Sequence, residues 1–222
     1  LHFLICDAQR CGRTEDLRSY LVEKSNVNLY KRLVNEDVIP HSQADLDEMG
    51  RRISQTFEEL EEAKSRDPDN DSHIFEINKK ICEMHAQIMD MESFKNGVSE
   101  IIAAEPSLSL KMDIYLCKMR MAIILNDRAG LVESANLASE VFESICDWDR
   151  KNRCKVYLGV YNLIRAEFKE AALLFSEGLA SFDAPELLEF NHLILYYVFS
   201  SLLSFTRTEL NAKILENSEV RR

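Results

Sequence analysis

Glycine and proline are scarce in this sequence, with six glycines and four prolines in 222 residues. Because these two residues are the strongest breakers of regular structure, the long segments between them are free to be helical. All six glycines are isolated, so the chain contains neither a GxGxxG turn nor a Walker-type phosphate loop. GxSxG and HExxH motifs are absent as well. The sequence therefore favours an almost entirely α-helical protein and predicts no cofactor.

Histidine is also rare, and the five histidines are scattered along the chain. Cys82 and His85 would lie one turn apart on a helix and could supply half of a zinc site. The chain has no second pair at a suitable spacing. We therefore expect no bound metal.

The six cysteines show no regular spacing, and a chain of this size does not need disulfides to hold a core. Reduced thiols are expected, which places the protein in the cytoplasm or nucleus. A catalytic Cys–His pair formed only by folding stays open from sequence. Cys117, Cys146 and Cys154 lie beside apolar residues in predicted helices, which favours buried structural thiols over a nucleophile.

The chain has 38 acidic and 27 basic residues, a formal net charge of −11. This charge repels nucleic-acid phosphates and anionic lipids, so we expect neither nucleic acid nor membrane as a partner. The longest apolar stretch, 190–205, contains Asn191, His192 and three serines. It is shorter than the roughly 20 apolar residues that a membrane helix needs. We predict a helix that is buried on most sides.

Residues 42–91 have the pattern of an antiparallel helical hairpin. Ser42 precedes the first helix, which has an apolar stripe in steps of three and four and ends before Pro68. The same alternation then runs from Ile74 to Met91, the spacing of a two-helix seam. Two readings stay open: a hairpin packed within its domain, or a projecting arm that binds a partner. Weaker helical stretches precede it at 14–24 and 27–36.

The second half of the chain predicts a series of paired helices. The pairs are 108–125 with 128–144, 149–165 with 167–181, and 185–204 with 206–217. Their spacing is close to the period of about 34 residues of tetratricopeptide arrays. A single pair cannot cover its own apolar face, so neighbouring pairs stack. We predict an N-terminal helical region at 1–106, followed at 107–222 by a tetratricopeptide-like α-solenoid.

Local residue choice supports this packing. Gly159, followed by Ala171 and by Phe175 four residues later, resembles the tetratricopeptide pattern. The two small residues let a pair of helices approach, and the phenylalanine fills the gap between them. The pattern's tryptophan is missing, so the match is tetratricopeptide-like only.

Charges gather at the start of the predicted helix 149–165. Asp147 or Asp149 can cap it, because a carboxylate accepts hydrogen bonds from the free N–H groups of the first turn. Arg150, Lys151 and Arg153 oppose the helix dipole there, so they need acidic partners. Those partners lie either within this chain or on another subunit. We take these three cations as candidate interface residues.

The preceding helix offers Glu140 and Glu143 as internal partners for the cations. Trp148, the only tryptophan, lies at a junction between two helix pairs. We interpret it as a packing wedge rather than an exposed interface anchor.

Several segments in register resemble the seventh non-ATPase subunit of the 26S proteasome regulatory lid. They are DWDRKNRCKVY at 147–157, FKEAALLFSEGLASF at 168–182, PELLEF at 185–190 and TELNAKILENSEV at 208–220. The resemblance is firm over 108–220 and looser upstream. The sequence departs from the family pattern at Cys154 and at Asp183-Ala184. A paralogous family, COP9 signalosome subunit 1, has a similar block and remains the alternative.

The resemblance implies a non-catalytic scaffold. In that family a PCI domain with a winged helix follows the helical repeats, so this chain, which begins at Leu1, is expected to be a fragment lacking it. The implied partners are other lid subunits and the ATPase base, in ubiquitin-dependent protein degradation, with no small-molecule substrate. Two other classes stay open, a tetratricopeptide-type adaptor that binds peptides and an enzyme with a hidden thiol.

Overall fold

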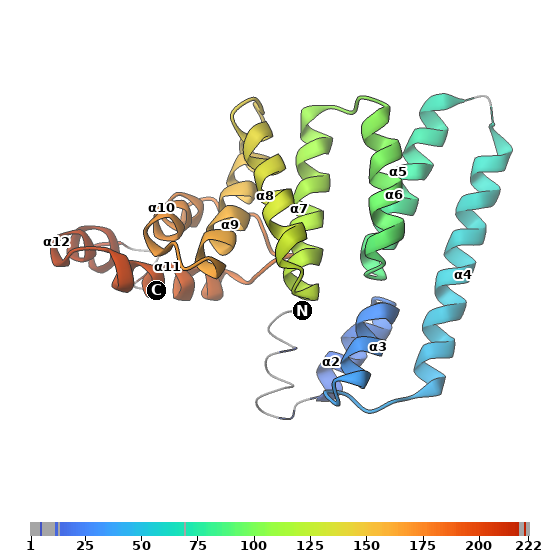
Figure 1. The fold of residues 1–222 in the computed structure, drawn as a ribbon, viewed down its shortest axis with the longest axis horizontal. Helices are drawn as coiled ribbons and strands as arrows, with labels where there is room; N and C mark the ends of the chain where they lie inside the picture. Colours follow the sequence, from blue (N-terminus) through green and yellow to red (C-terminus); the bar gives the residue numbers. More distant parts are fainter. Residues whose placement is uncertain (1–4, 6–11, 13, 69, 218–219, 221–222) are drawn as a thin grey trace. The chain divides into compact units, whose positions relative to one another are not determined.

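The computed structural model describes the chain except residues 1–4, 6–11, 13, 69, 218–219 and 221–222. Every regular element in the described part is helical, and none is a strand. Helices adjacent in sequence pack in pairs, as in an α-solenoid (Figure 1). The predicted all-α fold is confirmed. The chain divides into two compact units, 1–106 and 107–222.

The described part of the first unit contains five helices. They are α2 (Thr14–Glu23), α3 (Val27–Asn35), α4 (Gln43–Arg66), α5 (Asp71–Gln87) and α6 (Met91–Ala103). Helices α2 and α3 pack on the N-terminal part of α4, where Leu17, Tyr30 and Met49 are almost completely buried. Arg18 joins α2 to α4 through an ion pair with Asp45 at 2.6 Å.

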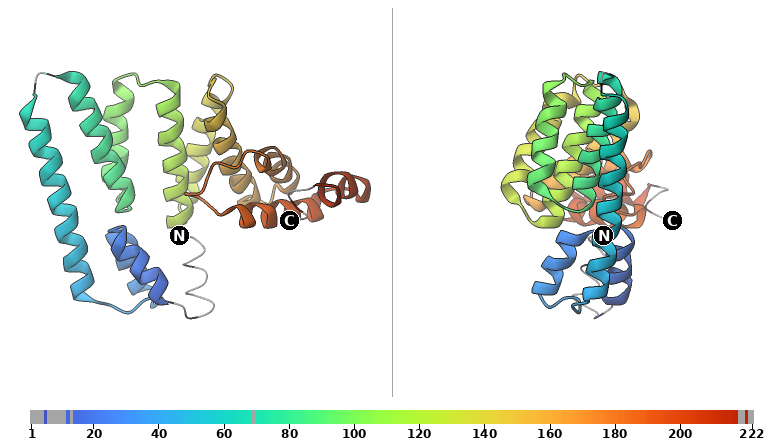
Figure 2. Two further views of the ribbon diagram at one scale, coloured as in Figure 1. Left: turned by 180° about the vertical axis from the view of Figure 1, so that it is seen from behind. Right: turned by 90° about the vertical axis from the view of Figure 1, so that its right-hand side faces the viewer.

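Helices α4 and α5 form the predicted antiparallel hairpin (Figure 2). The Ser42 hydroxyl accepts a hydrogen bond from the Asp45 N–H at 3.4 Å, so Ser42, which was predicted to precede this helix, is its N-cap. Asn70 caps α5 in the same way, through His73 N–H. Because α5 also packs against α6, this hairpin is part of a larger helical unit.

The predicted boundary at Met91 is wrong. Helix α5 ends at Gln87, and Met89 takes a left-handed conformation with φ of 60°. Asp90 then caps α6, which runs straight through Gly97. A Cβ atom on Gly97 would lie 3.5 Å from Cys82 Sγ, so this glycine faces α5 at an ordinary contact distance.

The second unit consists of antiparallel pairs, with one short irregular end. Its elements are α7 (Leu108–Leu125), α8 (Arg128–Phe142), α9 (Trp148–Ile164), α10 (Phe168–Leu179), α11 (Phe190–Ser204), α12 (Arg207–Leu210) and the π-helix η1 (Asn211–Leu215). Helix α7 packs on α8, and α10 packs on both α9 and α11. Helix α11 begins five residues later than predicted, and the predicted last helix is split into α12 and η1.

The core of the second unit contains the predicted contact between small and aromatic residues. Ala171 and Phe175 on α10 are both completely buried. A Cβ on Gly159 of α9 would come within 2.5 Å of the Phe175 ring. The ring therefore occupies the space that a side chain at position 159 would need, and this sets how closely α9 and α10 approach.

Helix α11 is less buried than the sequence suggests. Leu193, Tyr197, Ser200 and Ser201 face the core. On the opposite side Leu195, Phe199, Leu202 and Leu203 are 50–63% exposed. The prediction of a helix buried on most sides is therefore wrong. No helix in the described part of the chain combines the length and apolarity that a membrane crossing requires.

Ordinary residues make the turns after most of these helices. Among the residues that the structure describes, six non-glycine residues have φ between 50° and 61°, where glycine is usually found. They are Ser25, Asp37, Met89, Glu105, Asn126 and Ala166. The scarcity of glycine thus extends to helix ends.

Candidate interaction site at the start of α9

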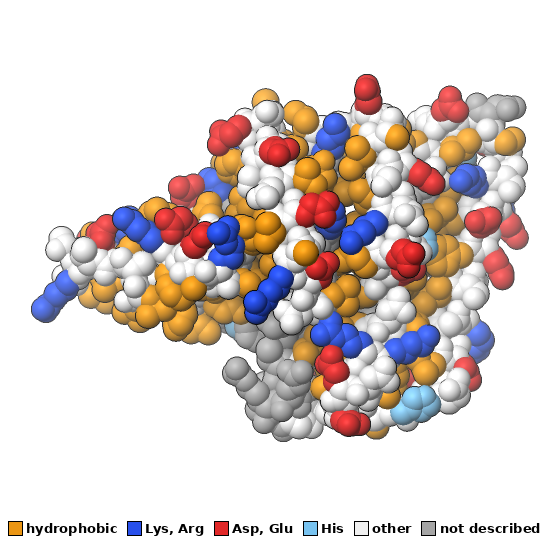
Figure 3. All heavy atoms as spheres, in the orientation of Figure 1, with side chains coloured by type: hydrophobic (Ala, Val, Ile, Leu, Met, Phe, Trp, Pro, Cys, Tyr) orange, Lys and Arg blue, Asp and Glu red, His pale blue; other side chains and the backbone are white. Residues whose placement is uncertain are grey.

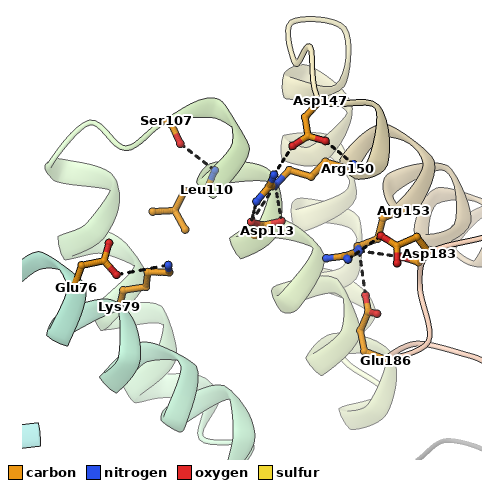
Figure 4. A network of polar contacts seen from close by, with 10 residues as sticks. All are labelled: Glu76, Lys79, Ser107, Leu110, Asp113, Asp147, Arg150, Arg153, Asp183 and Glu186. Carbon is orange, nitrogen blue, oxygen red and sulfur yellow. Dashed lines mark hydrogen bonds and ion pairs between the residues drawn. The ribbon is translucent and has the colours of Figure 1, made fainter.

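Asp147 and Arg150 join the start of α9 to α7. Asp147 Oδ1 accepts a hydrogen bond from the Arg150 N–H at 3.2 Å, as an N-cap does. The Arg150 guanidinium contacts Asp147 Oδ2 and also donates to both oxygens of Asp113 on α7, at 2.8–3.1 Å (Figure 4). The backbone and side-chain N–H groups of Arg150 lower the pKa of Asp147. A carboxylate held by these donors stays ionised and fixes the first turn.

Arg153 binds the segment that connects α10 to α11. Its Nε donates to the Asp183 carbonyl at 3.0 Å, and its Nη2 donates to Asp183 Oδ2, also at 3.0 Å. Glu186 lies 3.8 Å from Arg153 Nε and accepts a hydrogen bond from the Tyr157 hydroxyl at 3.0 Å. Figure 4 shows both carboxylates turned toward Arg153. Helix α9 therefore holds two segments that are distant in sequence.

The acids that neutralise these arginines are not the predicted ones. Asp113 and Asp183 lie 37 and 30 residues from their arginines, whereas the suggested acids were Glu140 on α8 and Glu143 just after it. The alternative of partners within this chain is therefore confirmed for Arg150 and Arg153, but the suggested acids are wrong because only the preceding helix was considered as an internal source. Asp113 did carry a signal, since it is the single acid in α7, a helix that is otherwise mostly apolar and basic.

Trp148 is exposed and Lys151 is half-buried at the same end of α9. Lys151 Nζ lies 5.4 Å from the centroid of the Phe142 ring, a cation–π distance. Trp148 is 64% exposed, so the prediction of a packing wedge is wrong. Ile145, only 3% exposed, lies in the buried part of this turn instead. A large exposed aromatic on a helix fixed by ion pairs is the kind of residue that anchors protein interfaces.

The described cysteines give little support for thiol or metal chemistry. Burial raises the pKa of Cys154 to about 12, which disfavours the nucleophilic thiolate. Cys82 is buried and lies 3.8 Å from the Phe94 carbonyl oxygen. Within the described residues no three His, Cys, Asp or Glu side chains are grouped to hold a metal ion. Cys6 and Cys11 lie outside those residues.

Comparisons with known proteins agree with the sequence resemblance. The family model described as 26S proteasome subunit RPN7 matches residues 42–213. Regulatory subunit RPN7 of Saccharomyces cerevisiae is 26% identical, with 96% of this chain and 55% of that protein covered. Non-ATPase regulatory subunit 6 of Oryza sativa is 28% identical, over 96% and 56% of the two chains.

The Dictyostelium discoideum subunit 6 is 31% identical over 68% of this chain and 39% of its own length. The chain spans about half the length of most of these curated relatives. The family model, in contrast, covers more than three quarters of the chain, including α4 to α12 and the ion pairs of α9. The chain therefore belongs to the RPN7 family of 26S proteasome subunits.

Proposed function

We propose that this chain is a non-catalytic scaffold of the proteasome regulatory lid, acting in ubiquitin-dependent protein degradation in the cytoplasm and nucleus. Its partners are other lid subunits and the ATPase base. The observation that carries the proposal is the family match over residues 42–213, in relatives named as non-ATPase regulatory subunits. The stacked helix pairs are consistent with this role, because such arrays present extended surfaces for protein contacts.

Within this role we assign different tasks to the charged and aromatic residues of α9. Arg150 and Arg153 are 34% and 33% exposed, and both are occupied by acids of the same chain. They position the helix and contribute only their outer edges to an interface. Trp148 and Lys151 at the same end are the residues that reach a partner. The flanking exposed residues Glu143 and Asp149 are acidic, so the partner surface is an apolar pocket for the indole, with basic groups opposite these two acids and an acidic group opposite Lys151.

The test separates contact from folding. The chain is reconstituted with the lid subunits of its source organism, and incorporation is measured for Trp148→Ala with Lys151→Glu. The matched control is Ile164→Ala, which removes an exposed apolar side chain (51%) from the other end of α9. The proposal is supported if the double variant shows reduced incorporation and the Ile164→Ala control does not.

Charge reversal of Arg150, Lys151 and Arg153 together tests the wider site. This variant breaks internal ion pairs, so its helix content must be compared with wild type by circular dichroism. Normal incorporation of both the double and the triple variant would refute α9 as the interface, while failure of the wild-type chain to join any lid assembly would refute the scaffold role.

A further inference from the structure

A cavity of about 250 Å³ lies between α5 and α6 in the first unit, two antiparallel helices that pack against each other (Figure 1). Its lining includes Asn78, Ile81 and His85 on α5 and Asn96, Gly97 and Glu100 on α6. His85 lies toward the turn that joins the two helices, whereas Asn78 and Glu100 lie at the far end. The cavity is therefore a short groove along both helices, which we call the α5–α6 groove.

Several polar groups of the α5–α6 groove have unused hydrogen-bonding capacity. Asn96 and Glu100 are exposed, and neither side chain is hydrogen-bonded or ion-paired to another described residue. Asn78 Oδ1 accepts a hydrogen bond from Lys64 Nζ at 3.0 Å, which leaves the two N–H donors of that amide. Asparagine is disfavoured inside helices because its side chain competes for backbone hydrogen bonds. Two asparagines in mid-helix along one groove therefore indicate a role other than helix formation.

The His85 ring is held in place at the other end of the groove. Its centroid lies 5.1 Å from that of the Phe57 ring on α4. Its Nδ1 lies 3.8 Å from Oδ2 of Asp90, the N-cap residue of α6. Nε2 is then the ring nitrogen left for a ligand. Between the two polar ends, Ile81 and Gly97 supply an apolar stretch.

We infer that the α5–α6 groove binds an extended peptide segment of a protein partner, with a basic side chain at Glu100. Asparagine amides both donate and accept, so they can pair with the N–H and C=O groups of a peptide backbone. The distance from Asn78 to His85 along α5 is about 10 Å, which equals about three residues of an extended chain. Whole small molecules usually occupy about 300–1,000 Å³, so a cavity of about 250 Å³ suits a short part of a longer chain better.

Charge favours a basic residue in that peptide. At the far end of the groove Lys64 is bonded to Asn78, and Lys79 lies 3.7 Å from Glu76, so Glu100 is the carboxylate without a counter-ion. Figure 3 shows acidic side chains distributed over α4 to α6 on one face of the first unit. The net charge of −11 attracts a basic segment from solution, which favours a partner protein over this chain as its source.

The test is a titration of the isotope-labelled 222-residue chain with the blocked tripeptide acetyl-Ala-Lys-Ala-amide, followed by two-dimensional NMR. This peptide has about 23 non-hydrogen atoms, so we expect a dissociation constant on the order of 10–100 µM. The side-chain amide signals of Asn78 and Asn96 should shift as the peptide binds. The peptide acetyl-Ala-Glu-Ala-amide should bind at least about tenfold more weakly, because its carboxylate meets Glu100.

A pair of matched variants locates the contact. Asn96→Ala with Glu100→Ala removes the two unpaired groups and should weaken binding of the lysine peptide by about tenfold or more. The control is Asn136→Ala with Glu140→Ala, which removes the same two residue types, also exposed and four positions apart, from α8. It should bind the peptide like wild type. If circular dichroism shows that the groove variant loses helix content, Glu100→Gln is measured in its place, with the same criteria.

Each result decides the proposal. Binding that the groove variant loses and the control keeps supports it. A wild-type chain that binds neither peptide at about 2 mM would overturn it. Equal affinity of wild type and groove variant would also overturn it, because the contact would then lie elsewhere. Acetyl-lysine-amide, which lacks the flanking residues, should bind more weakly than the tripeptide, and equal affinity would refute the backbone contacts.

Discussion

Replacing Gly159 with alanine should destabilise the second unit, although alanine is the better helix former. A new Cβ would meet Phe175 Cε1 at 2.5 Å and Cδ1 at 2.7 Å, closer than carbon atoms approach without displacement. The Phe175 ring is completely buried and packs near Tyr196, with 6.3 Å between ring centroids. It therefore has little room to move aside.

The two opposing effects can be estimated. Overpacking a core costs about 1–3 kcal/mol, and the upper half of that range fits a contact with a rigid ring. Gly→Ala in a helix contributes about 1 kcal/mol in the favourable direction. The free energy of unfolding should fall by about 1–2 kcal/mol, which lowers Tm by roughly 4–8 °C for a unit of this size.

Gly50 provides the matched control, because a Cβ there would meet nothing within 4 Å. Gly50→Ala should raise the stability of the first unit by up to about 1 kcal/mol. Thermal melts followed by circular dichroism measure both changes. The emission of Trp148, the only tryptophan, assigns a transition to the second unit.

A double-mutant cycle identifies the cause. Phe175→Leu removes the ring edge, so Gly159→Ala should cost less in that background, with a coupling energy of about 1 kcal/mol. An unchanged or higher Tm for Gly159→Ala in the wild-type background would refute the reasoning, because the close approach would then be relaxed at no cost.

Three further predictions follow from the α9 region and the thiols. The lowered pKa of Asp147 means that its contribution to stability is present above its ordinary pKa of 3.8 and is lost as pH falls through the folded value. Asp147→Asn should therefore be less stable than wild type in urea melts at neutral pH, and the difference should vanish in acid; a constant difference would contradict this. Trp148→Ala should change the free energy of unfolding by less than about 0.5 kcal/mol, since the ring is mostly exposed; a larger loss in the same melts would restore the wedge interpretation. A thiol-labelling reagent should modify exposed Cys146 quickly and buried Cys82 and Cys154 only on unfolding, as read by peptide mapping. Fast labelling of Cys154 would instead support the alternative of an enzyme with a reactive thiol.

Periodicity alone located most helices of this chain. The apolar stripe of α4 and the predicted ranges 108–125, 128–144, 149–165 and 167–181 gave boundaries within a few residues of the observed ones. Helix α6 was not predicted, although it runs from Met91 to Ala103 and contains Gly97, which faces Cys82 at an ordinary contact distance. A glycine in the sequence does not by itself mark the end of a helix.

The residues that bind the α9 arginines could not be predicted in the same way. Asp113 and Asp183 reach Arg150 and Arg153 only because the helix pairs stack in a particular order. The exposure of Trp148 and of the outer stripe of α11 depends on that order too. Local pattern gives the apolar face of a helix, but which neighbour covers it is a property of the assembled array.

The left-handed residues at the helix ends leave this fold below its attainable stability. A non-glycine residue in that region has its Cβ too close to the following carbonyl, and this conformation costs about 1–2 kcal/mol. Ala166, with φ of 61°, has no side-chain hydrogen bond to offset this, unlike an asparagine. Glycine at such a position relieves the clash but increases the conformational entropy of the unfolded chain. Substitutions in these turns could therefore raise the stability of the protein without changing the proposed contact residues Trp148 and Lys151.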